Sequence, residues 1–272
     1  MTAEVTDRAG APIMSVEGLS FSYGEKQIFR DLTFTIEPGE FVCIVGPSGA
    51  GKSTLLQCLA GLNSPRAGVV SFEQAAVTAP PANLTVVFQD YSRSLMPWLS
   101  ARDNITLPLR SAKVRVAERN RRASDALNEV GLPGVENSYP WELSGGMQQR
   151  VAIARALAYR PSMVIMDEPF ASVDAQTRAD LEDLTLQVKN HLGIAVILVT
   201  HDIDEAVYLA DRVLVLSGSP ATLTDIVPVG LGAERDQILT KERPEFAELR
   251  ARIYRQIKRP NMTAELSMGV DE

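Results

Sequence analysis

Three short segments of the chain are almost continuously apolar and rich in branched side chains. They cover residues 41–45, 163–166 and 195–199. A strand with one face in water alternates apolar and polar residues, whereas a strand covered on both faces is apolar throughout. These segments therefore predict strands of a parallel sheet that is flanked by helices.

The N-terminal part of the chain has a different pattern. Residues 13–16, 21–23 and 32–36 lie in a stretch where apolar and polar positions alternate. Alternation with a period of two is typical of strands that expose one face. We therefore expect an antiparallel β portion at the edge of the sheet.

The middle of the chain, over about residues 90–160, shows helical spacing and no convincing strand. Apolar residues recur as on one face of a helix, for example at Ala123, Leu127 and Val130 before Gly131. The simplest interpretation is a mostly helical insertion in an α/β core with a mostly parallel sheet.

We expect a single domain over residues 13–240, followed by a helical tail over residues 241–272. One helical stripe of the tail carries the apolar residues Phe246, Leu249, Ile253 and Ile257. Such a stripe fits a solvated helix docked on the core, which we favour, or a contact with acidic lipid or a partner helix. The basic residues around the stripe are Arg250, Arg252, Arg255, Lys258 and Arg259.

Composition narrows the classes of partner. The chain of 272 residues has a formal net charge of −7. Sequence-independent binding to nucleic acid relies on positive charge that attracts the phosphates, so no nucleic acid is expected as a partner. Cys43 and Cys58 lie in apolar patterns and are expected to be buried thiols of a protein in a reducing compartment. No apolar run approaches the roughly 18 residues that cross a bilayer. We expect a cytosolic protein that reaches the membrane only through partners.

A glycine-rich segment, the phosphate loop, follows the first apolar strand and precedes a helix expected over residues 53–62. Residues 46–53 fit the pattern Gly-x-x-x-x-Gly-Lys-Ser between a strand and a helix, as this motif requires. Its glycines let backbone N–H groups point at phosphate oxygens, and the helix N-terminus adds a favourable dipole. Lys52 is expected to bridge the outer phosphates, and the Ser53 hydroxyl to bind Mg²⁺. The residues assigned to nucleotide binding here are Gly46, Pro47, Ser48, Gly49, Ala50, Gly51, Lys52, Ser53 and Thr54.

By itself the phosphate loop does not separate kinases, GTPases and ATPases. Two carboxylates, Asp167 and Glu168, follow the strand at residues 163–166. Ligands of α/β folds bind at the carboxyl ends of strands, so we assign Asp167 to the metal and Glu168 to the polarisation of an attacking water. The alternative interpretation is an acidic helix cap without chemistry.

Two further polar residues stand at strand ends. His201 follows the apolar strand expected to end at Thr200, and Gln89 follows residues 86–88. A single histidine in such a place is more often a structural hydrogen-bond partner than a catalytic group, and Gln89 on its own indicates little. The neighbouring motifs decide how both are interpreted.

A second glycine segment spans residues 143–150, with the sequence Leu-Ser-Gly-Gly-Met-Gln-Gln-Arg. Ser144 is suited to cap a helix, and Gly145 and Gly146 allow a close backbone approach. The segment can therefore hold an anion at a helix N-terminus, although it has no lysine. Taken alone, it fits a plain capped helix equally well.

With these motifs in this order, the sequence resembles the ATP-binding subunits of ABC transporters over roughly residues 13–218. The second glycine segment is similar to the signature segment of that family, which is highly specific between the phosphate loop and the two carboxylates. The resemblance implies an ABC-type P-loop NTPase fold with an inserted helical subdomain, and ATP and Mg²⁺ as cofactors. The further roles that it implies are adenine stacking for Tyr23, catalysis and metal contact for Gln89, the D-loop aspartate for Asp174, the catalytic switch histidine for His201, and the second half of the ATP site for Ser144, Gly145, Gly146 and Gln148.

The resemblance also implies an assembly. Each ATP is expected to lie between the phosphate loop of one subunit and the second glycine segment of another, in a head-to-tail homodimer that ATP closes and hydrolysis at Glu168 releases. The implied partners are two transmembrane permease subunits, docked near Gln89 and the helical insertion, and indirectly an extracytoplasmic solute-binding protein. The implied location is the cytoplasmic side of the cell membrane, as a peripheral protein.

A narrower resemblance points to the importer branch for nitrate, sulfonates, taurine and related small anions. It rests on residues 89–91, 95–105, 175–178 and 201–206, and on Met147. One departure is the sequence Ala-Ser-Val-Asp that ends at Asp174, where that branch has Gly-Ala-Leu-Asp. Since the aspartate is retained, the departure bears on fine coupling rather than on ATPase activity.

Other functions fit the sequence less well. ABC ATPases that act in DNA repair carry a long coiled-coil insertion, and those that act on ribosomes usually carry two ATPase sets in one chain. An exporter subunit, or an importer subunit for another solute class, is a nearer alternative. A regulatory module without hydrolysis is disfavoured because Lys52, Asp167, Glu168 and His201 are all present.

Overall fold

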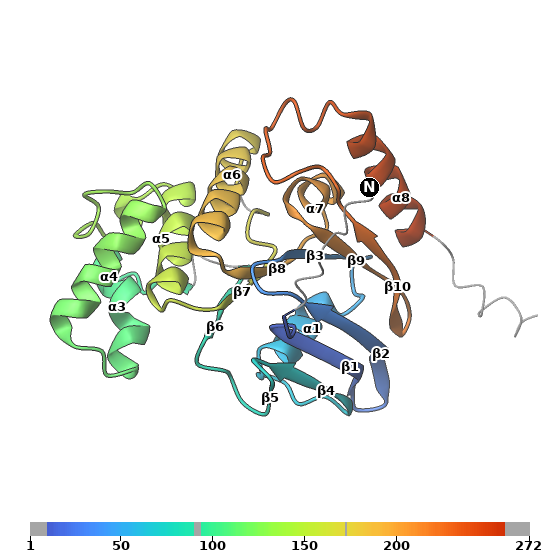
Figure 1. Cartoon of the computed structure of the whole chain (residues 1–272). Coiled ribbons are helices and arrows are strands. Elements are labelled where there is room, and N and C mark those ends of the chain that lie inside the picture. Colours follow the sequence, from blue (N-terminus) through green and yellow to red (C-terminus); the bar gives the residue numbers. More distant parts are fainter. Residues whose placement is uncertain (1–9, 90–93, 172, 259–272) are drawn as a thin grey trace, which may run out of the picture.

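The computed structural model describes residues 10–89, 94–171 and 173–258. Its strands form one ten-stranded sheet in the order β5-β4-β1-β2-β10-β9-β3-β8-β7-β6 (Figure 1). The strands are β1 (Met14–Tyr23), β2 (Lys26–Ile36), β3 (Phe41–Val45), β4 (Ala67–Phe72), β5 (Ala75–Ala76), β6 (Leu84–Val87), β7 (Met163–Asp167), β8 (Ala195–Val199), β9 (Arg212–Gly218) and β10 (Ala221–Pro228).

The helices of the described residues lie around this sheet. Figure 1 shows α3, α4 and α5 gathered at one end of the molecule, with α6 and α7 above the central strands and α1 below them. They are α1 (Lys52–Leu59), α3 (Ala101–Ser111), α4 (Val116–Glu129), the short 3₁₀ helix η1 (Pro140–Glu142), α5 (Gly145–Ala158), α6 (Ala175–Leu192), α7 (Ile203–Leu209) and α8 (Pro244–Ile257). None of the helices in the described ranges is long and apolar enough to span a bilayer.

The central strands are buried on both faces, as their continuous apolar sequences predict. In β3, Phe41, Cys43 and Val45 join the core beneath the α3–α8 helices, while Val42 and Ile44 join the core on the α1 side. β7 and β8 alternate in the same way. The prediction of a sheet covered by helices on both sides is confirmed, and Cys43 and Cys58 are buried and unpaired.

Four neighbouring strands run parallel and bring four chain segments to one edge. β3 pairs with β8, β8 with β7, and β7 with β6, all in parallel. Their carboxyl ends lead into the phosphate loop, Thr200, Glu168 and Phe88, respectively. Ligand sites of open α/β sheets form at this edge because the loops after the strands converge there. The sheet order therefore puts the candidate residues side by side.

The N-terminal strands form the expected antiparallel portion. β1 pairs in antiparallel fashion with β2 and β4, and β4 with β5. This portion joins the rest of the sheet through a short parallel pairing of β2 with β10, at Phe29 and Ala221. Its apolar face packs with α1 in a common core.

The helical insertion and the docked tail helix are also confirmed. Within 94–158 the structure contains α3, α4, η1 and α5 and no strand. In α8, Phe246 and Ile253 are fully buried and Leu249 and Ile257 pack against the same core. The proposed division into residues 13–240 and 241–272 stays a prediction, and Arg259 lies outside the described residues.

Some element boundaries differ from the expectation, and contacts explain two of them. The helix expected over residues 53–62 ends at Leu59, because Gly61 takes a left-handed backbone with φ of 69°, and a Cβ there would lie 2.6 Å from backbone atoms of Ala79. β8 ends at Val199 rather than at Thr200, whose hydroxyl accepts a hydrogen bond from the backbone N–H of Asp202. The first difference involves a long-range contact with Ala79, and the second a local hydrogen bond between Thr200 and Asp202.

Candidate functional site

The phosphate loop folds tightly after β3, and its glycines explain how. A Cβ on Gly46 would lie 2.7 Å from the backbone oxygen of Leu216, and a Cβ on Gly51 only 2.2 Å from a methyl carbon of Ile28. Gly49 and Gly51 both have φ of 80°, a left-handed conformation that L side chains rarely adopt. Only glycine fits these positions, so the loop has the shape that the motif predicts. Pro47 accepts a hydrogen bond from the N–H of Ala50, which closes the turn.

Lys52 opens α1 and points back into the loop. Its ammonium donates hydrogen bonds to the backbone oxygens of Gly46, at 2.9 Å, and Pro47, at 3.1 Å. Burial lowers the pKa of Lys52, while the carboxylates of Glu168 and Asp167 oppose that shift. The cation is thus held inside the loop and beside two acids. Ser48 and Gly49 at the tip of the loop are exposed, and Ser53 and Thr54 follow Lys52 in the helix.

Asp167 and Ser53 form a polar pair that fits a magnesium ion. Burial raises the pKa of Asp167, and a hydrogen bond with the Ser53 side chain lowers it in part. One carboxylate oxygen of Asp167, Oδ1, is buried and lacks a hydrogen-bond partner among the described residues. An unsatisfied buried carboxylate oxygen beside a serine hydroxyl offers the oxygen ligands that Mg²⁺ prefers. The residues present therefore fit the metal expected from the sequence.

Three candidate catalytic residues from three different strand ends meet at Glu168. Its carboxylate oxygen Oε2 accepts a hydrogen bond from the side-chain amide of Gln89 at 3.1 Å, and lies 3.2 Å from Nδ1 of His201. Glu168 itself has φ of 43°, which is uncommon for a residue with a side chain and costs conformational energy. Its N–H is fixed by a 2.9 Å hydrogen bond to the backbone oxygen of Val199.

Tyr23 lies at the end of β1, with about half of its side chain exposed. Its ring packs edge-on against Phe21, with 4.9 Å between ring centroids. The contact with Phe21 holds the Tyr23 ring, and the rest of the ring remains accessible to solvent. The following strand, β2, brings Ile28 against Gly51 of the phosphate loop. The hairpin that carries Tyr23 therefore touches the phosphate loop, and the adenine-stacking role stays a prediction.

The second glycine segment forms the start of α5. Ser144 is the N-cap and its hydroxyl accepts a hydrogen bond from the N–H of Met147 at 3.3 Å. Gly146 has no room for a side chain, because a Cβ would lie 2.6 Å from the Thr177 methyl. Gln148 donates its side-chain amide to the backbone oxygens of Pro140 and Leu143, so it holds the preceding turn. Ser144 and Gly145 are exposed.

Asp174 caps the next long helix. Its side chain accepts hydrogen bonds from the N–H and the hydroxyl of Thr177, and these bonds lower the pKa of Asp174. Because Thr177 also packs on Gly146, the start of α6 lies against the start of α5. The departure at Ser172 lies outside the described residues, as do Asp90 and Tyr91.

The structure brings together only one part of the predicted site. Lys52, Asp167 and Glu168 lie near one another, and Gln89 and His201 join Glu168. Within the described residues no hydrogen bond or ion pair links the Ser144 segment to that group, and Figure 1 shows α5 beside α3 and α4 rather than beside α1. Within one chain, the two glycine segments are therefore separate.

Three residues around His201 were not identified as site residues from the sequence. Arg178, Thr200 and Glu205 line a small cavity together with Glu168 and His201. Thr200 and Glu205 are buried, and Arg178 reaches them from α6. The available signals were Thr200 directly before His201 and Glu205 one helical turn after it, but neither signal is specific.

Comparison with known proteins identifies the relatives of this chain. The family model described as ABC transporter matches residues 29–171. The nitrate import ATP-binding protein NrtD of Synechococcus elongatus is 40% identical over 81% of this chain and 81% of its own length. An aliphatic sulfonates import ATP-binding protein of Burkholderia cenocepacia is 41% identical over 89% of this chain and 86% of its own length.

A solved structure has the same fold. It is a dimeric ATP-binding cassette in a post-hydrolysis state, bound to ADP and phosphate. Its chain is 32% identical to this one, with a TM-score of 0.69 over 79% of this chain and 98% of its own.

Proposed function

This chain belongs to the ABC transporter family, and on that premise we propose that it is the ATP-hydrolysing subunit of a bacterial importer for small anionic solutes such as nitrate, sulfonates or taurine. The ATPase activity follows from the family. The observation that carries the proposal for this chain is the position of Glu168. Its carboxylate lies within hydrogen-bond reach of both Gln89 and His201, beside a phosphate loop with a buried lysine.

The phosphate loop binds the nucleotide in this proposal. Its backbone N–H groups and the start of α1 contact the phosphates. The ammonium of Lys52 exchanges its hydrogen bonds to the backbone oxygens of Gly46 and Pro47 for charge-assisted hydrogen bonds to phosphate oxygens. Tyr23 stacks on the adenine. Ser53, Asp167 and Gln89 hold Mg²⁺, which when bound neutralises charge on the outer phosphates.

Glu168 acts as the general base. A carboxylate that accepts a hydrogen bond from Gln89 and lies against His201 has a fixed direction, so it can take the proton of a water placed in line with the terminal phosphate. His201 contacts both the Glu168 carboxylate and the terminal phosphate, and so keeps the two groups aligned. General-base catalysis of this kind contributes about a hundredfold or more to the rate.

The separation of the two glycine segments supports a shared site. Ser144, Gly145 and Gly146 are exposed or partly exposed at a helix N-terminus that lacks a cation, which suits the terminal phosphate of an ATP held by another subunit. A head-to-tail homodimer supplies this arrangement twice. Asp174 lies beside the second glycine segment through Thr177 and belongs to the same interface.

The partners follow from the proposed importer. The homodimer docks on two transmembrane permease subunits near Gln89 and the helical insertion, at the cytoplasmic side of the membrane, and an extracytoplasmic binding protein delivers the solute. The nitrate and sulfonate relatives match this chain about equally well. We therefore propose the solute class, small anions, and assign the choice among them to the permease and the binding protein.

The proposal is tested by ATP turnover and by dimerisation of the wild type and of Glu168→Gln. We expect the variant to bind ATP, to accumulate as a closed dimer and to hydrolyse ATP at least about a hundredfold more slowly, since the amide cannot accept the proton. Glu248→Gln, an exposed change on α8, is the matched control and should leave turnover unchanged. Normal turnover by Glu168→Gln would contradict the assignment of the base.

A further inference from the structure

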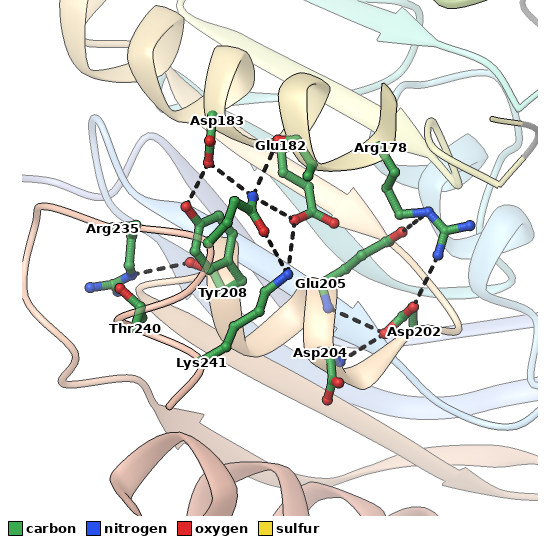
Figure 2. Close-up of polar contacts among 12 residues, drawn as sticks. Arg178, Glu182, Asp183, Asp202, Asp204, Glu205, Tyr208, Arg235, Thr240 and Lys241 are labelled. Carbon is green, nitrogen blue, oxygen red and sulfur yellow. Dashed lines mark hydrogen bonds and ion pairs between the residues drawn. The ribbon is translucent and has the colours of Figure 1, made fainter. Parts of the chain in front are cut away.

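A partly buried polar cluster surrounds the backbone of His201. We call Arg178, Thr200, Asp202 and Glu205 the Arg178 cluster. Arg178 comes from α6, and Asp202 and Glu205 come from the N-cap and first turn of α7 (Figure 2). Thr200 directly follows β8. His201 therefore lies in the middle of a turn that three elements hold.

Thr200 ties together the residues on both sides of His201. Its hydroxyl donates to the carboxylate of Glu205 at 2.6 Å and accepts from the backbone N–H of Asp202 at 2.9 Å. Thr200 is 2% exposed and Glu205 5%, so the bond between them is shielded from water. A buried group that loses its hydrogen-bond partner is costly. These two bonds fix the backbone that carries the imidazole.

Arg178 connects the same turn to α6. Its guanidinium lies 3.4 Å from a carboxylate oxygen of Asp202 and 3.7 Å from one of Glu205. Figure 2 marks both contacts with dashed lines. Arg178 follows Asp174, the N-cap of α6, by one helical turn. The turn around His201 is thereby fastened to the start of the helix that Asp174 caps.

The neighbouring acidic residues do not compete for Arg178. Lys241 pairs with Glu182, and the Tyr208 hydroxyl donates to Asp183 (Figure 2). The side-chain amide of Gln237 donates to both carboxylates. These contacts attach the segment before α8 to α6. The guanidinium of Arg178 therefore pairs with the carboxylates of the turn that carries His201.

We propose that Thr200, Glu205 and Arg178 are positioning residues for His201. Because Arg178 links the turn around His201 to α6, the orientation of the imidazole depends on the position of the start of α6. The side chain of His201 is 61% exposed, so packing does not hold the ring, and its approach to Glu168 depends on the backbone beneath it. The inference rests on the proposed function, because it concerns how Glu168 and His201 are aligned for ATP hydrolysis.

The first test compares Thr200→Val with Thr200→Ser. Valine has nearly the shape of threonine but lacks the hydroxyl, whereas serine retains both hydrogen bonds. We expect kcat for ATP hydrolysis to fall about tenfold or more in Thr200→Val, the size typical of losing a bonded partner behind an active-site group, with little change in KM. Thr200→Ser should retain most of the wild-type kcat. Equal kcat values for the two variants would overturn the proposal.

The second test uses two arginines that reach α7. Arg178→Ala should lower kcat, whereas Arg250→Ala should not, because Arg250 pairs at 3.5 Å with the exposed carboxylate of Asp204 and lies outside the cluster. Loss of kcat in both variants to the same degree would mean that any loosening of α7 has this effect, and would overturn the specific role of Arg178.

A double-mutant cycle separates positioning from general destabilisation. If Thr200 acts through His201, Thr200→Val should lower kcat no further in a His201→Ala background. Additive losses would overturn the proposal. If wild-type protein and His201→Ala hydrolyse ATP equally, the proposed role of His201 fails; if His201→Ala is impaired but Thr200→Val is normal, only the positioning role fails.

Discussion

Two glutamates near His201, Glu168 and Glu205, have opposite surroundings. Glu168 is partly exposed, bonded to Gln89 and close to His201, in a strained left-handed backbone conformation. Glu205 is buried, and burial raises its pKa to about 7. Thr200 and Arg178 lower that pKa, while Asp202 and Glu182 raise it further. In the proposed function the first glutamate is the general base, whereas the second is proposed to position His201.

Glu205 gives the residue-scale prediction. Its folded pKa lies above its ordinary value of 4.5, so the stabilisation from the neutral carboxyl is fully present below about pH 4.5 and is lost as the pH rises to about 7. Glu205→Gln stays neutral and should not show this loss. From pH 4.5 to 8, the variant should gain stability relative to wild type, by a few kcal/mol at about 1.4 kcal/mol per pKa unit.

Urea unfolding at a series of pH values measures this gain. Glu248→Gln removes an exposed carboxylate and is the matched control, which should follow the wild-type curve. A constant difference between Glu205→Gln and wild type across the range would show that the pKa of Glu205 is the same in the folded and unfolded states, and would contradict the raised pKa.

At the scale of elements, the C-terminal helix is part of the core. Phe246 and Ile253 of α8 are buried, and two of its arginines pair with acidic residues of other elements, Arg250 with Asp204 and Arg252 with Asp225. The apolar stripe is therefore used in docking, which leaves the exposed face of α8 polar. This favours the docked helix over the lipid-binding alternative.

A pair of neighbouring residues on α8 tests this. Ile253→Ala removes a fully buried side chain and should lower the free energy of unfolding by about 2 to 5 kcal/mol. Tyr254→Ala alters the exposed face, where the Lys258 ammonium makes a cation–π contact 4.8 Å from the centroid of the Tyr254 ring. This change should lower the free energy of unfolding by about 1 kcal/mol or less. Thermal and urea unfolding measure both, and equal losses would contradict a docked helix.

At the scale of the whole molecule, the proposed site belongs to two chains. Lys52 is the first residue of α1 and Ser144 is the N-cap of α5, yet no hydrogen bond or ion pair joins their segments within the described chain. Their geometry supports sites that form between subunits, where symmetry repeats the contact twice.

Mixing two inactive variants tests the shared site. Lys52→Ala and Ser144→Arg should each turn over ATP poorly, since each spoils one half of both sites in its own homodimer. A mixed dimer combines the intact Lys52 of one chain with the intact Ser144 of the other, so the mixture should regain activity, up to about a quarter of wild type if the two sites act independently. Turnover of the mixture no higher than that of the separate variants would contradict the shared site. Ser100→Arg, which removes a similar helix cap from α3, is the control for lost capping.

The sequence by itself determined the buried strands, the phosphate loop and the placement of polar residues at strand ends, because these follow from side-chain periodicity and from motifs of fixed local spacing. Only the tertiary structure decided that β3, β8, β7 and β6 are neighbours, and hence that Gln89, Glu168 and His201 meet. The Arg178 cluster also belongs to that level. Its Arg178 contacts join α6 to residues more than twenty positions away, and such long-range pairing leaves no periodic signal along the chain.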